Sequence, residues 1–89
     1  MRDIERVIDL IRGQFPDVRW EQLKVVHPGV DDDGLWFFTL PGFRNNVQVE
    51  SSTGMCPFII EDYRPGQLAH GKTVEETAST VIDWLKTST

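Results

Sequence analysis

The first segment of the chain has the hydrophobic pattern of an amphipathic helix. Between residues 3 and 15 the apolar positions recur at the helical period, and the charged residues occupy the other positions. Gly13 and Pro16 should end this helix, because glycine suits the C-terminal turn and proline cannot continue the hydrogen-bond ladder. The predicted buried stripe consists of Ile4, Val7, Ile8, Ile11 and Phe15.

The last segment has the same period and a clear start signal. Thr73 followed by Glu76 matches a capping box, in which each side chain satisfies a backbone amide of the other residue. Trp84 lies at the border of the apolar stripe, where its indole should cover the rim of the sheet. Residues 86–89 should fray. The stripe of this second predicted helix consists of Val74, Ala78, Val81, Ile82 and Leu85.

Between these helices, short runs of β-branched and aromatic residues alternate with turn-forming clusters, which predicts strands. The four predicted strands are residues 22–27, 34–40, 46–51 and 57–62, joined by loops at 28–33, 41–45 and 52–56. Loops this short favour an antiparallel meander. Residues 64–72, with Pro65, Gly66 and Gly71, are expected to form a mobile connection to the second helix.

This order of elements predicts an α+β fold. A four-stranded antiparallel meander most simply packs with its N- and C-terminal helices on one face, as a two-layer sandwich. With 89 residues there is room for one hydrophobic core, so residues 1–89 are expected to form a single domain.

Alternation along the strands assigns side chains to the two faces of the sheet. The face toward the helices should carry Leu23, Val25, Trp36, Phe38, Leu40, Val47, Val49, Phe58 and Ile60. The opposite face should have an apolar middle among polar residues, formed by Val26, Leu35, Phe37 and Ile59. Isolated apolar side chains are common on surfaces and can be shielded by arginine and lysine stems. The alternative is that these four residues are an interaction face, because an apolar patch with a polar rim suits protein association.

Charge narrows the classes of partner. Nine lysines and arginines against fourteen aspartates and glutamates give a net charge of −5, which repels phosphate backbones and anionic membranes. Nucleic acid is therefore disfavoured as a partner. The last-ranked alternative is a local nucleic-acid patch formed by Trp20, Trp36 and Phe43 with Arg19 and Arg44.

The sequence also bears on the compartment. No apolar run approaches the roughly 20 residues that span a bilayer, and the N-terminus lacks a basic-then-apolar signal pattern. The lone Cys56 cannot form an intramolecular disulfide, which agrees with a reducing compartment. We therefore expect a cytoplasmic location and no membrane partner.

Residues 51–56 are the segment richest in small polar groups and possible nucleophiles. A catalytic Cys56 would need a lowered pKa from a nearby base, and the spacing of His27 and His70 brings neither close. The structural interpretation is a hydrogen-bonded turn, with Cys56 as a small buried apolar group before Pro57. An anion bound there would need a cation from outside the loop, namely Arg44, Arg64 or Lys72. The candidate ligand loop consists of Ser51, Ser52, Thr53, Gly54 and Cys56.

No pattern in the chain predicts a cofactor or a metal. Asp31, Asp32 and Asp33 are consecutive, whereas a calcium loop needs alternating ligands and a distal glutamate. One cysteine and two histidines make no zinc pattern. Glu50 and Glu61, on neighbouring predicted strands, could form a carboxylate pair, but acid–base catalysis also needs a pocket and a raised pKa. We assign no catalytic residue, no cofactor and no metal site.

Two stretches of the chain resemble small uncharacterised bacterial proteins of an αββββα type. They are residues 49–58, with the sequence VESSTGMCPF, and residues 71–76, with the sequence GKTVEE. These motifs are a turn, a strand start and a helix cap, so the resemblance implies a fold and no catalytic residue. In size and acidity the chain is also similar to immunity proteins, which neutralise a toxin by binding it.

Together these patterns favour a non-enzymatic protein-interaction domain that uses the apolar sheet face. The expected partner is either a second copy, giving a homodimer, or another protein, as for a small inhibitor or an accessory subunit. The alternative is a small-molecule or anion-binding domain, or a thiol-dependent catalytic domain, centred on residues 51–56.

Overall fold

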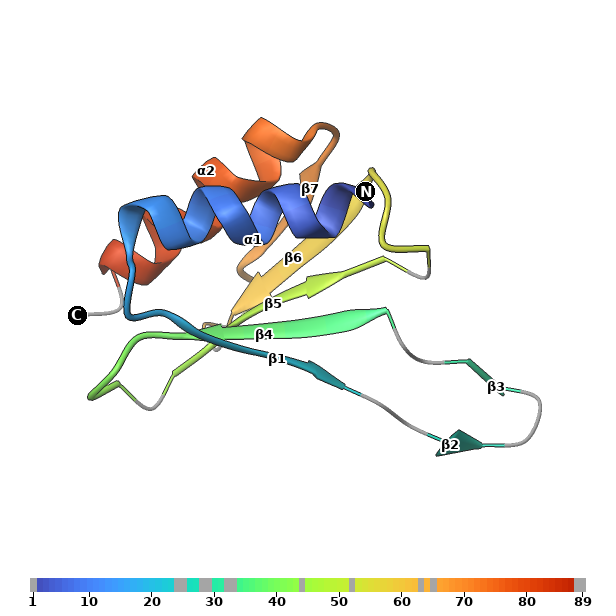
Figure 1. Cartoon of the computed structure of the whole chain (residues 1–89), viewed down its shortest axis with the longest axis horizontal. Coiled ribbons are helices and arrows are strands. Elements are labelled where there is room, and N and C mark those ends of the chain that lie inside the picture. Colours follow the sequence, from blue (N-terminus) through green and yellow to red (C-terminus); the bar gives the residue numbers. More distant parts are fainter. Residues whose placement is uncertain are drawn as a thin grey trace.

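Both helices predicted from the sequence are present, and they lie side by side on one face of a sheet (Figure 1). Helix α1 spans Asp3–Gln14 and helix α2 spans Val74–Thr87. The structure is a computed structural model, and it describes residues 2–23, 26–27, 30–31, 34–43, 45–51, 53–62, 64 and 66–87. No helix within these ranges is long and apolar enough to cross a membrane.

Helix α1 buries the stripe that its sequence predicts. Phe15, directly after the last helical residue, is half-buried and packs against the core. Gly13 does not end the helix as predicted, because it lies inside the helix and its φ is outside the left-handed region. The helix ends at Gln14, two residues before the proline that cannot continue it. Its buried residues are Ile4, Val7, Ile8 and Ile11.

Helix α2 begins with the predicted Thr73 cap, and the reciprocal bond of Glu76 goes to the amide one residue earlier than predicted. The Thr73 hydroxyl accepts the Glu76 N–H at 3.0 Å, whereas the Glu76 carboxylate accepts the N–H of Lys72 at 3.0 Å instead of that of Thr73. The helix continues through Thr87, so the expected fraying at residues 86–87 is wrong, and residues 88–89 lie outside the described residues. Its buried residues are Val74, Thr77, Ala78, Val81 and Leu85.

The sheet confirms the predicted α+β class and has five strands rather than four. Its strands are β1 (Arg19–Leu23), β4 (Leu35–Thr39), β5 (Val47–Glu50), β6 (Phe58–Asp62) and β7 (Leu68–Gly71). They lie in the order β1-β4-β5-β6-β7, and every neighbouring pair is antiparallel. Both helices lie above this sheet in Figure 1. We call the face toward the helices the inner face and the opposite one the outer face.

Strand β7 is the element that the sequence pattern missed. It pairs with β6, so the prediction of a mobile connection over residues 64–72 is wrong. The strand contains no aromatic or β-branched residue, which is the pattern that favours strands. Its tertiary contacts favour it instead, because Ala69 packs half-buried against the core and Gly71 lies directly under Thr77 of α2.

The first predicted strand, residues 22–27, is divided in the structure. Strand β1 starts earlier and ends at Leu23, and β2 (Val26–His27) pairs with β3 (Val30–Asp31) in a separate two-stranded sheet. The predicted loop over residues 28–33 therefore contains a short strand. Lys24 and Val25 lie outside the described residues.

The core lies between the helices and the inner face. Leu40 is half-buried at the margin of the core. Leu23 was predicted for the inner face, but it pairs with Leu35 and so has a register position of the outer face. Trp20, which pairs with the buried Phe38, is an inner-face residue that sequence alternation did not assign. The buried strand residues agree with the prediction and are Trp36, Phe38, Val47, Val49, Phe58 and Ile60.

Candidate functional site

The outer face is the surface of the sheet that the two helices leave uncovered. Directly paired residues of neighbouring strands lie on the same face, so the register defines rows across it. One row consists of Glu21, Phe37, Gln48, Glu61 and Leu68. The next row contains Leu35, Glu50, Ile59 and His70. The structure therefore places three of the four predicted interaction residues on this face.

Val26 is the exception among the predicted interaction residues. It belongs to β2, which pairs only with β3 in the described part of the chain and is not a strand of the five-stranded sheet. Val26 therefore lies outside the five-stranded sheet, on which the prediction placed it. The cause is the position of the first strand, which ends at Leu23 in the main sheet rather than at residue 27 as the alternating pattern suggested.

The apolar side chains of the outer face form two groups. Leu35 and Phe37 on β4 are half-buried, whereas Ile59 on β6 and Leu68 on β7 are 37% and 52% exposed. Strand β5 lies between these groups and presents polar side chains. The predicted apolar middle is therefore wrong, and the face has a polar central strand with apolar groups on both sides.

Leu68 is the outer-face residue that sequence analysis missed, because β7 was not predicted as a strand. The one available signal was the spacing of Leu68 and His70, which places both on the same face once the segment is extended. Leu68 is the most exposed of the large apolar side chains in the described residues.

Among the described residues, the charge on the outer face is mainly negative. Glu21, Glu50 and Glu61 are all exposed there, against Arg19 and a histidine. A shallow hollow near the β1 edge includes Phe37 and is rimmed by Arg19 and Glu21. The outer face thus combines apolar groups with an excess of carboxylates.

The loop after β5 holds the start of α1. The Ile4 N–H donates to the Gly54 carbonyl at 2.9 Å, and the Asp3 N–H lies 3.4 Å from the Met55 sulfur. In return, the Asp3 carboxylate accepts the Cys56 N–H at 2.9 Å. The first amides of a helix have no partner inside the helix, and the residue before α1 supplies no side-chain cap. The loop therefore supplies the missing cap of α1.

The hydroxyl groups of the loop are used within the loop. Ser51 Oγ donates to the Met55 carbonyl at 2.7 Å, and Thr53 Oγ1 accepts the Met55 N–H at 3.3 Å. Gly54 has φ +73°, and a Cβ there would lie 3.2 Å from the Arg2 side chain. These contacts agree with a hydrogen-bonded turn. Ser52, also predicted for this loop, lies outside the described residues.

Cys56 lies in surroundings that suppress its reactivity. Partial burial raises the pKa of the Cys56 thiol, and a hydrogen bond and the negative charge of Asp3, followed by the charge of Glu75, raise it further. A nucleophilic cysteine needs a lowered pKa, so that thiolate is present at neutral pH. The thiol is half-buried and packs against the core, which agrees with a small apolar packing group.

Alkylation of Cys56 should therefore be slower in the folded protein than in the urea-unfolded chain at neutral pH, because the raised pKa leaves less thiolate. The substitution Asp3→Ala should speed the reaction in the folded protein, since it removes a carboxylate that raises this pKa. Iodoacetamide labelling followed by mass spectrometry measures both rates. Faster labelling of the folded than of the unfolded chain would contradict this description of the loop.

A shallow hollow beside the loop contains several of the polar candidates. Glu50, Ser51, Cys56 and His70 line it together. His70 is therefore closer to Cys56 than the sequence spacing predicted, but it is not among the groups that shift the pKa of that thiol. Glu50 pairs with Ile59 rather than with Glu61, so the two glutamates are diagonal neighbours and not a directly opposed pair.

Of the cations proposed for an anion site, Arg64 is paired with a carboxylate outside this loop. Arg64 forms an ion pair with Asp62, and its Nε donates to the same carboxylate at 2.9 Å. The Asp62 side chain is 2% exposed, so Arg64 neutralises a buried charge. Arg44, Asp32 and Asp33 lie outside the described residues. Among the described residues, no group of three histidine, cysteine, aspartate or glutamate side chains could hold a metal ion.

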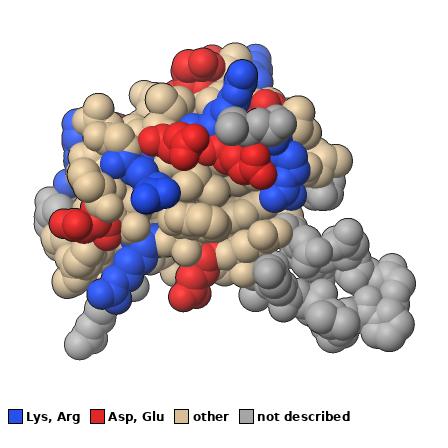
Figure 2. Space-filling model, in the orientation of Figure 1, with Lys and Arg blue, Asp and Glu red and all other residues tan. Residues whose placement is uncertain are grey.

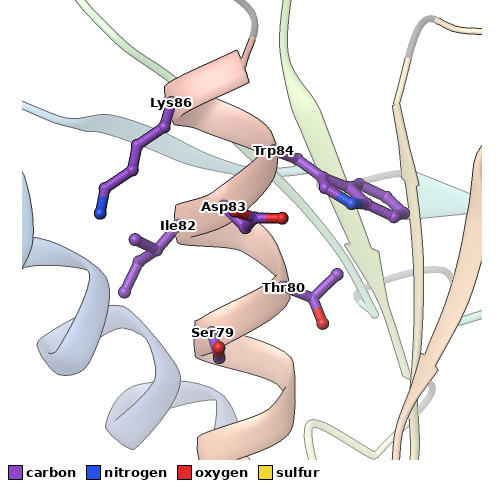
Figure 3. Close-up of a pocket in the computed structure, with 6 residues that line it drawn as sticks. All are labelled: Ser79, Thr80, Ile82, Asp83, Trp84 and Lys86. Atoms are coloured by element: carbon purple, nitrogen blue, oxygen red, sulfur yellow. The ribbon is translucent and has the colours of Figure 1, made fainter.

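Helix α2 carries a further hollow that the sequence did not suggest (Figure 3). Thr80 and Trp84 project to one side of the helix, and Ile82 and Lys86 project to the other. Trp84 is half-buried and packs against the core. The side chains of this hollow all come from one helix and diverge from it, so they do not converge on a common ligand.

The residues proposed for nucleic-acid stacking do not form one surface. Trp36 is 1% exposed and belongs to the core, whereas Trp20 and Phe43 are 42% and 38% exposed. Figure 2 shows acidic and basic side chains interspersed on the viewed face, without a continuous basic region. An aromatic platform that includes Trp36 is therefore excluded.

Comparison of the chain with models of protein families, with curated proteins and with solved structures gave no match.

Proposed function

We propose that this chain is a non-enzymatic protein-interaction domain that binds another protein through the outer face of its sheet. The observation that carries the proposal is the uncovered outer face, with Ile59 and Leu68 exposed by 37% and 52% beside the half-buried Leu35 and Phe37. A surface that combines exposed apolar groups with polar side chains can associate with a protein partner.

The charge of the outer face supports a partner with basic residues over a second copy of the same face. In the part of the chain that the structure describes, Glu21, Glu50 and Glu61 outnumber Arg19 on this face, so two outer faces brought together would oppose carboxylates with carboxylates. Juxtaposed like charges weaken an interface, whereas complementary charges speed encounter and select the partner. The proposed partner surface therefore carries apolar groups that meet the two apolar groups of the outer face, and lysine or arginine opposite its carboxylates.

The substitution Leu68→Glu should weaken binding of such a partner, because it places a charge on the most exposed apolar position of the face. Affinity capture from the source cells, followed by calorimetry with the purified partner, measures this. We expect the dissociation constant to rise by about tenfold or more, the effect of disrupting a residue that contributes more than about 1 kcal/mol to an interface. The affinity of the wild type should also fall with added salt.

The matched control is Leu10→Glu, which changes a leucine of α1 that is 44% exposed on the helix side of the molecule. This variant should bind as the wild type does. Equal loss of binding in both variants, or capture of no protein by the wild type, would contradict the proposed function.

A further inference from the structure

One edge of the sheet is formed by a strand that has a single partner strand among the described residues. Strand β1 is the outermost strand, and within the described residues it pairs only with β4. At the other edge, β7 is accompanied by α2, which packs against it. An unpaired edge exposes backbone donors and acceptors that can pair with another strand, and proteins usually protect it with proline, lysine or a bulge. The five residues of β1, RWEQL, include neither proline nor lysine.

An exposed tryptophan marks this edge. Trp20 pairs with Phe38 on the inner face, yet Trp20 is 42% exposed while Phe38 is fully buried. The helices therefore do not extend far enough to cover the indole. Tryptophan is enriched at interfaces, because its large apolar ring gains most from removal from water. The inner face thus offers an apolar anchor on the edge strand.

The two charges that flank Trp20 have opposite signs, so they can pair with the same two charges of a second copy of the strand. Arg19 and Glu21 lie on the outer face on either side of Trp20, both are exposed, and neither has an ion-pair partner among the residues described. When two copies of β1 pair antiparallel about Trp20, each Arg19 lies opposite the Glu21 of the other copy. A register centred on Glu21 would instead oppose two carboxylates, which is unfavourable.

We propose that two copies of this chain associate through antiparallel pairing of their β1 strands, centred on Trp20. The charge pattern favours a second copy as the partner of this edge, because in this register the arginine and the glutamate of Arg-Trp-Glu face the glutamate and the arginine of the other copy. The symmetry axis passes between the two Trp20 residues and is perpendicular to the sheet. The helices of both copies then lie on one side, and both outer faces lie on the other as one continuous surface.

This edge dimer does not depend on the outer face binding a partner. The two surfaces are distinct, since the contacts of the dimer are made by β1, whereas Leu68 lies on β7 at the opposite edge of the sheet. Leu68→Glu should therefore leave the dimer intact while it weakens partner binding. Failure of one proposal is in this way distinguishable from failure of the other.

Charge reversal tests the dimer and its register together. Sedimentation equilibrium of the wild type should give a dimer that dissociates on dilution. Arg19→Glu and Glu21→Arg should each raise the dimer dissociation constant on the order of tenfold, because each places like charges opposite one another twice. The double variant Arg19→Glu with Glu21→Arg should restore the dimer. Asp9→Arg, an exposed charge reversal on α1 and away from both proposed surfaces, is the control and should leave the dimer dissociation constant unchanged.

A cysteine at the axis gives a second test of the register. In a Cys56→Ser background, Trp20→Cys should form a disulfide-linked dimer on mild oxidation, because the two position-20 side chains face each other. Glu21→Cys should not, since position 21 faces position 19 of the other copy. A wild type that is monomeric at every concentration, or a double charge variant that fails to dimerise while the wild type does, would overturn the proposal.

Discussion

The substitution Gly71→Ala should lower the free energy of unfolding by about 3 kcal/mol, the upper part of the range for overpacking a well-filled interior. Gly71 is buried at the end of β7, beneath α2. A Cβ at this position would lie 2.8 Å from Thr77 Cβ and 3.0 Å from Thr77 Cα, and closer still to the Thr77 hydroxyl. Because one of these atoms is backbone, the helix itself would have to move. Urea unfolding followed by circular dichroism measures the change.

Gly13→Ala is the matched control for this prediction. Gly13 lies inside α1, and a Cβ there would meet nothing within 4 Å. Alanine in a helix is favoured over glycine by roughly 0.5–1 kcal/mol, so this variant should be slightly more stable than the wild type. If Gly71→Ala unfolds at the same urea concentration as the wild type, the close packing of α2 on β7 is wrong.

Asp3→Ala should cost about 2 kcal/mol of unfolding free energy, in line with loss of a hydrogen bond to a charged acceptor and of a carboxylate at a helix N-terminus. The Asp3 carboxylate accepts the Cys56 N–H at 2.9 Å, and it lies in the first turn of α1. Its removal leaves a loop amide without its acceptor and weakens the connection between the loop and the helix. Thermal and urea unfolding both report the loss.

Asp9→Ala provides the comparison, because Asp9 is an exposed residue in the middle of the same helix. Surface substitutions of this kind usually change stability by no more than about 0.5 kcal/mol. Equal effects of Asp3→Ala and Asp9→Ala would mean that the 51–56 loop does not stabilise the start of α1, and the loop would then be open to another role.

The helices and most of the core were predictable because periodicity is a local property of the sequence. The stripe from Ile4 to Ile11 and the cap at Thr73 need no tertiary information beyond a partner surface. The alternating runs that include Trp36 and Val49 were equally clear, because their β-branched and aromatic residues form half-buried strands.

The missed elements depend on contacts that are distant in the sequence. Strand β7 has no strand-forming pattern of its own and is stabilised by pairing with β6 and by the fit of Gly71 under Thr77. The start of β1 is set by pairing of Arg19 with Thr39 rather than by the apolar run that follows it. Intrinsic propensity is a weak guide wherever tertiary pairing supplies most of the stability.

The candidate surfaces were predicted only in part, because only some of their residues are assigned by a local pattern. Phe37 and Ile59 were placed on the outer face because alternation within a single strand assigns them. Leu68 was missed together with its strand, and Val26 was misplaced by the boundary of β1. The capping role of the loop could not be predicted, because the hydrogen bond between Asp3 and Cys56 joins residues 53 positions apart.

Methyl NMR of the chain with its captured partner is the most direct test of the outer face as a binding surface. Addition of the purified partner should shift the methyl signals of Leu35, Ile59 and Leu68, which lie on that face. The signals of Leu10 on α1 and Ile82 on α2, which lie on the helix side of the sheet, should stay in place. Shifts confined to Leu10 or Ile82, with the three outer-face residues unchanged, would contradict the account.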